Sequence, residues 1–190
     1  MNFENFIRNK IRICNLHLRN FRQIKYCLPT NTRILLVNNF ILSTLDYCNS
    51  LLICQPQYQI QRLQKLMNKG VRFILDLQFD EHITPFLCQL HFLPVQFRIR
   101  YKICLIAHKI VYHIAPEYLV ENFKMFQPNE NINLRPEIGR DKYMMQINLS
   151  QQKKSNLYTK IILEWNGLPV QIRSIGQINC FKTELSFFPK

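Results

Sequence analysis

Four positively charged residues between Gln59 and Asp76 recur with the period of an α-helix: Arg62, Lys65, Lys69 and Arg72. At about 100° per residue they fall on one side of a helix, and no acidic residue interrupts the run. A plain solvated helix face is the ordinary interpretation of such a pattern, although solvated faces usually mix both signs. Four cations in a row can contact successive phosphates, so the pattern also favours a polyanionic partner.

Two further groups of cations show the same helical spacing. One lies in the segment 5–26 and the other in the segment 95–113, and their members are Arg12, Arg19, Arg22, Arg98, Lys102 and Lys109. The net charge is +13, and the first 75 residues hold 11 Lys and Arg against two acids, Glu4 and Asp46. Such a potential favours nucleic acid or an anionic membrane surface as partner, and Lys and Arg bind nucleic-acid backbones without reading sequence.

Residues that could bind a metal or attack a substrate do not form a convincing set. His82, Cys88 and His91 fall within ten residues, but a fourth zinc ligand at suitable spacing is missing. Asp80 and Glu81 are the only adjacent acids, and they precede a helix start, where capping explains them. We therefore expect no catalytic residue, no metal site and no cofactor.

Three other residue types have structural explanations that we expect to apply. Asp46 is a lone acid in an apolar segment, so we expect it to pair with a basic side chain or to cap a backbone. Trp165, the only Trp, could stack on a base, but anchoring the terminal helices is the favoured role. The seven cysteines contain no Cys-x-x-Cys pair and predict reduced thiols, with Cys48 and Cys54 in the core.

The hydrophobic pattern predicts a mainly all-α chain, a bundle of about six to eight helices with one isolated short strand pair at most. In the segment 59–76 an apolar stripe opposes the cations: Ile60, Leu63, Met67, Gly70 and Ile74. The segment 33–53 is apolar nearly all round, which predicts a helix at the centre of the bundle, after a cap in Thr30 to Thr32. Further helices are expected at 5–26, 95–113, 115–120, 157–165 and 178–188, and a short one that Thr84 caps with Pro85 at its first position.

The predicted domains are a helical bundle over 1–123, a partly irregular linker over 124–156 with a strand at 143–149, and a helical tail over 157–190 that packs back on the bundle. The N-terminus lacks an apolar signal segment, and no run reaches the roughly 18 apolar residues of a membrane span. We therefore expect an intracellular protein, in the cytoplasm or the nucleus.

Three ordered segments carry a resemblance to a known family. They are Leu45-Asp46-Tyr47-Cys48-Asn49-Ser50-Leu51-Leu52, then Asp80-Glu81-His82-Ile83-Thr84-Pro85 with Leu90-His91-Phe92-Leu93-Pro94-Val95, and then Trp165-Asn166-Gly167-Leu168-Pro169 with Ile172-Arg173. In this order and spacing, over about Ile11 to Phe187, the chain resembles the C-terminal region of the polyprotein of non-LTR retrotransposons, the LINE elements of the jockey and chicken-repeat type. It departs from the family's usual residues at Phe92, Glu164 and Gly167.

The resemblance implies a thumb and post-thumb region that follows the catalytic palm of a reverse transcriptase, with target-primed reverse transcription as the parent activity. Polymerase chemistry needs two metal ions held by carboxylates, including an adjacent Asp pair, and the chain has no Asp-Asp. We therefore expect a non-catalytic, nucleic-acid-binding fragment and no enzyme activity from the chain alone. Its expected partners are RNA or DNA and, in trans, a reverse transcriptase catalytic domain, with no membrane and no small-molecule substrate.

Two alternatives remain open on the sequence. One is a truncated open reading frame with no independent function. The other is a protein-interaction module that uses the apolar segment 33–53, which would require that segment to be exposed.

Overall fold

A computed structural model describes residues 3–125, 143–146 and 157–187. The chain divides into two compact units, Met1–Ile99 (unit 1) and Arg100–Lys190 (unit 2). The described residues form helices and turns and no strand, which confirms the predicted all-α class. The division falls within one helix, α6 (Val95–Val111), and does not coincide with the domain boundaries expected around the segment 124–156.

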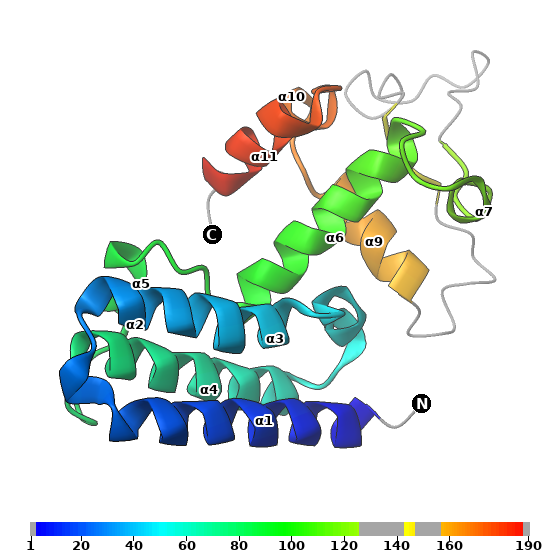
Figure 1. The fold of residues 1–190 in the computed structure, drawn as a ribbon. Coiled ribbons are helices and arrows are strands. Elements are labelled where there is room, and N and C mark those ends of the chain that lie inside the picture. The colour runs from blue at the N-terminus through cyan, green and yellow to red at the C-terminus, as the bar shows by residue number, and fades with distance from the viewer. Residues whose placement is uncertain (1–2, 126–142, 147–156, 188–190) are drawn as a thin grey trace, which may run out of the picture. The chain divides into compact units, whose positions relative to one another are not determined.

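Unit 1 consists of three long helical rods, three shorter helices and the start of α6, shown from blue to green in Figure 1. The first rod is α1 (Phe3–Gln23), which the short helix η1 (Lys25–Cys27) follows. The second rod is formed by α2 (Thr30–Leu36), the π-helical segment η2 (Val37–Leu42) and α3 (Ser43–Asp46). After the 3-10 helix η3 (Asn49–Cys54) comes the third rod, α4 (Gln57–Leu75), and then α5 (Thr84–Gln89) and the start of α6.

The apolar stripe predicted for α4 forms the centre of unit 1. Ile60, Leu63, Met67, Gly70 and Ile74 are all buried, as predicted. Gly70 faces η2, and a Cβ atom at this position would lie 3.1 Å from Cγ1 of Val37. Since Val37 is itself buried, a glycine is what allows α4 and η2 to approach this closely.

The second rod is central, as predicted, but shorter than predicted. Its buried residues include Val37, Ile41, Leu42 and Leu45, yet the α-helical rod ends at Asp46 and not at Ile53. Cys48 adopts a left-handed backbone with φ of 53°, which interrupts the helix before η3. The expected cap in Thr30 to Thr32 is also wrong, because Pro29 occupies the N-cap position and no side chain caps α2.

Two details of the predicted short helix and of the cysteines are also corrected. Thr84 is the first residue of α5 and Ile83 occupies its N-cap position, so the predicted cap lies one residue too late. Cys48, expected in the core, is exposed because it lies in the left-handed break before η3, and Cys54, the last residue of η3, is only half-buried. All seven thiols are free, as predicted.

Unit 2 contains the remainder of α6 together with α7 (Glu117–Val120), α9 (Leu157–Asn166), α10 (Val170–Arg173) and α11 (Ile178–Phe187). Trp165 on α9 is fully buried, as its anchoring role predicts, and its ring lies 5.9 Å from Phe181 on α11. Trp165 Nε1 donates to the backbone oxygen of Tyr143 at 2.7 Å. The side chain of Asn166 forms two hydrogen bonds with the backbone of Met145, at 2.9 and 3.1 Å. The Trp165-Asn166 pair therefore holds the described part of the segment 143–149.

The strand predicted at 143–149 is represented by one antiparallel bridge between Met125 and Met145. Residues 147–149 of that prediction, and most of the linker predicted at 124–156, lie outside the described residues. Over the described part of the chain, no helix is both long enough and apolar enough to cross a lipid bilayer.

Candidate nucleic-acid interface

The cations predicted on α1 and α4 come from two helices that lie side by side and run in the same direction (Figure 1). Contacts along the pair set their register. Lys69 Nζ donates to Asn15 Oδ1 at 3.2 Å, and one turn or more further on the ring of Phe21 lies 6.0 Å from that of Phe73. The C-terminal part of α1, from Asn15 to Phe21, therefore packs against the part of α4 from Lys69 to Phe73.

The α4 cations lie on the outer side of the helix, opposite the buried stripe. Lys65 and Lys69 are exposed, whereas Arg62 and Arg72 are half-buried. Arg62 Nη1 donates to Gln59 Oε1 at 3.0 Å, one turn back on the same helix. The predicted opposition of a basic row and an apolar stripe on α4 is confirmed.

The α1 cations form a second outward row. Arg12, Arg19 and Arg22 are exposed and, together with Asn15, recur at spacings of three and four residues. Asn15 is also the residue that Lys69 reaches from α4, so the α1 row borders the α4 row. Neighbouring helices pack about 8–10 Å apart, so the two rows lie next to each other and form one cationic surface.

We call this surface the basic face and define it by six residues: Arg12, Arg19, Arg22, Arg62, Lys65 and Lys69. Acids scarcely interrupt it. Of the two acids in the first 75 residues, Glu4 pairs with Arg8 at 3.2 Å near the start of α1, and Asp46 pairs with Arg98. The charge of the basic face is therefore not neutralised from within its two helices.

Arg72, the last of the predicted α4 cations, has a different environment. Its guanidinium donates to the backbone oxygens of Gln78, Phe79 and Glu81 at 3.1–3.2 Å. Three of its five N–H groups are used in holding the loop after α4. Arg72 lies at the end of the basic row of α4, but its guanidinium holds the backbone of the loop after α4 in place.

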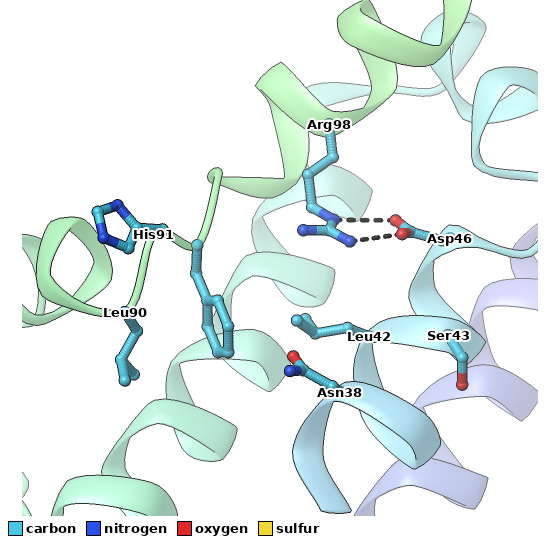
Figure 2. Close-up of a pocket in the computed structure, with 8 residues that line it drawn as sticks. Asn38, Leu42, Ser43, Asp46, Leu90, His91 and Arg98 are labelled. Carbon is cyan, nitrogen blue, oxygen red and sulfur yellow. Dashed lines mark hydrogen bonds and ion pairs between the residues drawn. The ribbon is translucent and has the colours of Figure 1, made fainter. Parts of the chain in front are cut away.

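Arg98 was predicted to belong to the α6 row, but the structure directs it inward. Its Nε donates to Asp46 Oδ1 at 2.9 Å and its Nη2 to Asp46 Oδ2, a two-point pair that Figure 2 shows. The side chains of Arg98 and Asp46 are 20% and 26% exposed. The prediction that Asp46 pairs with a basic side chain is confirmed, and Arg98 is a structural residue because its donors face this carboxylate.

The Asp46–Arg98 pair borders a shallow pocket of about 450 Å³ within unit 1. Leu42, Leu90, His91 and Phe92 also line it (Figure 2). His91 has a left-handed backbone with φ of 54° and follows α5, and the Phe92 amide donates to Leu87 O at 2.8 Å. This hydrogen bond closes the helix, and Phe92 enters the core. Residues of two motif segments, Asp46 of the first and Leu90 to Phe92 of the second, thus line the same pocket.

Lys102 and Lys109, the other two cations predicted on α6, are exposed and belong to unit 2. Their spacing of seven residues places them on one side of the helix. They form a pair of exposed cations on unit 2.

The metal-ligand candidates do not converge. His82, Cys88 and His91 are exposed, and within the described residues no three His, Cys, Asp or Glu side chains are grouped so as to hold a metal ion. Glu81 has a local role, since its Oε1 accepts a hydrogen bond from the Gln78 amide at 2.6 Å.

Lys10 is a basic residue whose role the sequence analysis missed. It is 4% exposed and donates to the backbone oxygens of Thr44 and Tyr47, the latter at 2.6 Å. These carbonyls lie around the C-terminal end of α3, where a cation is favoured. Burial lowers the pKa of Lys10 from its ordinary value, although nearby Asp46 opposes the shift. Its position on the apolar stripe of α1, between Ile7 and Cys14, was the available signal.

Phe79 and Lys25 were also missed. Phe79 is 91% exposed in the loop after α4, and the Arg72 guanidinium lies 5.7 Å from its ring centroid. Lys25 forms an ion pair with Asp76 at the end of α4. Neither residue belongs to a periodic pattern, so the helical spacing that located the basic rows could not find them.

Comparisons of the chain with protein-family models, with curated proteins and with solved structures found no match. The resemblance to non-LTR retrotransposon polyproteins therefore rests on the three motif segments and stays a prediction.

Proposed function

We propose that this chain is a non-catalytic helical module that binds RNA or DNA through the phosphate backbone, as a thumb-like region would in a parent reverse transcriptase. The observation that carries the proposal is the basic face, where cations of two neighbouring helices form one outward surface. Phosphate contacts by such side chains supply affinity without sequence specificity. In this proposal the chain contributes binding alone, and polymerisation requires a separate catalytic domain.

The packing of unit 1 supports this proposal over the protein-interaction alternative. That alternative needs the apolar segment 33–53 to be exposed, whereas Val37, Ile41, Leu42 and Leu45 are buried between the other rods. Leu35 and Phe40 of this segment remain exposed, but they are single exposed residues and are not part of the buried apolar side of the rod.

Charge reversal on the basic face tests the proposal. We expect the triple variant Arg19→Glu, Lys65→Glu, Lys69→Glu to lose affinity for a hairpin RNA and for a DNA duplex by roughly tenfold to a hundredfold. The reason is that three phosphate contacts are replaced by repulsion. Fluorescence anisotropy with end-labelled nucleic acids measures the change.

The matched control carries the same change of net charge in unit 2: Lys124→Glu, Lys160→Glu, Lys182→Glu, all at exposed positions. It should lose less than about threefold, because none of the three substituted residues belongs to the basic face and the change of net charge is the same. Equal losses in both variants would mean that charge alone, and not the basic face, determines binding. No binding by the unaltered protein would favour the truncated reading frame without a function of its own.

A further inference from the structure

The C-terminal ends of α1 and α4 enclose a pocket of about 250 Å³ within unit 1. Its lining includes three cations, the acid Asp76, the exposed ring of Phe79 and the buried ring of Phe73; the cations are Arg22, Lys25 and Arg72. Arg22 is a member of the basic face, so the pocket continues that surface at its end.

The loop that carries Phe79 is held in place by specific contacts. Arg72 donates to the backbone oxygens of Gln78, Phe79 and Glu81, and the Glu81 carboxylate accepts from the Gln78 amide. These contacts fix the backbone on both sides of Phe79, and yet its side chain is 91% exposed. A single exposed aromatic residue is ordinary, but here a fastened loop presents a ring beside cations.

The two faces of the Phe79 ring differ. The Arg72 guanidinium lies over the ring, 5.7 Å from its centroid, in cation–π geometry. With the side chain 91% exposed, the ring has a face available to a flat partner. A nucleobase is such a partner, since every base offers a π-face and stacking on protein aromatics is tolerant of sequence.

The charges of the pocket suit the phosphate that accompanies a base. Lys25 forms an ion pair with Asp76, so the Asp76 carboxylate is directed to Lys25. The hydrogen bond from Lys25 lowers the pKa of the Asp76 carboxyl. Arg22 is exposed, and its side chain makes no hydrogen bond or ion pair with the described part of the chain. Its guanidinium is therefore available for a backbone phosphate next to a stacked base.

We propose that this pocket binds an unpaired nucleotide of a single strand or a frayed end, with the base stacked on Phe79 and the adjacent phosphate bound by Arg22. Arg72 is a positioning residue, because it holds the loop and its guanidinium lies 5.7 Å from the centroid of the ring. The inference rests on the proposed function and adds a site for unpaired bases to a surface that otherwise contacts phosphates. Bases inside a duplex are stacked on each other and do not reach the ring.

Two probes of equal charge separate base stacking from phosphate binding. One is a fluorescein-labelled 12-mer of thymidine and the other is a 12-mer of abasic tetrahydrofuran units. Binding of the abasic strand measures phosphate contacts alone. Since base–aromatic stacking changes affinity by about fivefold to more than a hundredfold per base, we expect the protein to prefer the thymidine strand at least fivefold.

Phe79→Leu should abolish this preference and leave the affinity for the abasic strand unchanged, because leucine is apolar but has no π-face. Phe79→Trp should retain it. Tyr118→Leu, which removes an aromatic side chain 72% exposed in unit 2, is the matched control and should keep the preference. Melting temperatures should agree among all variants, since both substituted side chains are exposed.

Each result decides between the two proposals. Equal affinity of the unaltered protein for both strands, or a preference that survives Phe79→Leu, overturns the stacking site and leaves the proposed function standing. Absence of binding to either strand overturns the stacking site, and absence of binding to the hairpin RNA and the DNA duplex as well overturns the proposed function.

Discussion

Among the basic residues of unit 1, two groups look alike in sequence and differ in structure. Lys10 and Arg98 lie inward, each with fixed partners: backbone carbonyls after α3 for Lys10 and the Asp46 carboxylate for Arg98. The six residues of the basic face lie outward on α1 and α4. We call Lys10 and Arg98 the interior pair. The same residue types thus stabilise the fold in one region and remain available for a ligand in the other.

This difference indicates that burial and fixed hydrogen-bond or ion-pair partners distinguish a structural cation from a ligand-binding one. Charge and spacing in the sequence do not distinguish them. Removing a partly buried charge from its partner leaves an uncompensated ion, which is costly. An exposed pair such as Glu4–Arg8 is solvated in either state and contributes little. Substitutions in the interior pair should therefore lower stability, whereas substitutions in the basic face should lower affinity.

The largest effect is expected from Asp46→Ala. It leaves the Arg98 guanidinium without its carboxylate, and the cost should be about 2–3 kcal/mol, somewhat below that of a fully buried pair because both side chains are partly exposed. Urea unfolding followed by circular dichroism measures it. Glu4→Gln, which breaks the exposed pair, is the control and should cost less than about 0.5 kcal/mol. If Asp46→Ala and Glu4→Gln lowered the free energy of unfolding by similar amounts, the distinction between structural and exposed cations would be contradicted.

A smaller effect, dependent on pH, is expected from a third inward basic residue, His108 in unit 2. Its side chain is fully buried, its ring lies 4.4 Å from that of Phe181, and Nε2 donates to Ile175 O at 2.8 Å. Nδ1 is buried without a hydrogen-bond partner within the described residues. Burial lowers the pKa of His108 from 6.5, more than the bond to Ile175 raises it.

The sign of this effect follows from proton uptake. Below pH 6.5 the unfolded chain binds a proton at this histidine that the folded state resists, so the free energy of unfolding falls as the pH falls and is unaffected above that range. Urea unfolding reported by Trp165 fluorescence between pH 7 and pH 5 should show the decrease. His108→Gln should weaken the pH dependence, and His113→Gln, at an exposed position, should not. An unchanged dependence in His108→Gln would show that other groups cause it.

Sequence periodicity could predict the features that depend on one helix. The apolar stripe and the basic row of α4 follow from a 3.6-residue repeat in the printed chain, and the central position of the second rod follows from a segment that is apolar nearly all round. The break at Cys48, the inward turn of Arg98 and the loop of Phe79 could not be predicted in this way. Arg98 and Asp46 are 52 residues apart in sequence, so only the tertiary fold makes them partners. The fold class was therefore predictable, whereas the membership of the basic face was not.

The salt dependence of nucleic-acid binding tests the central claim most directly. If all six residues of the basic face neutralise one phosphate each, log K should fall with log salt with a slope of about −5.4 for duplex DNA. The triple variant Arg19→Gln, Lys65→Gln, Lys69→Gln should reduce the magnitude of the slope by about 2.7, since three counterion-releasing contacts are lost. Our account predicts that reduction, and an unchanged slope in the triple variant would contradict it.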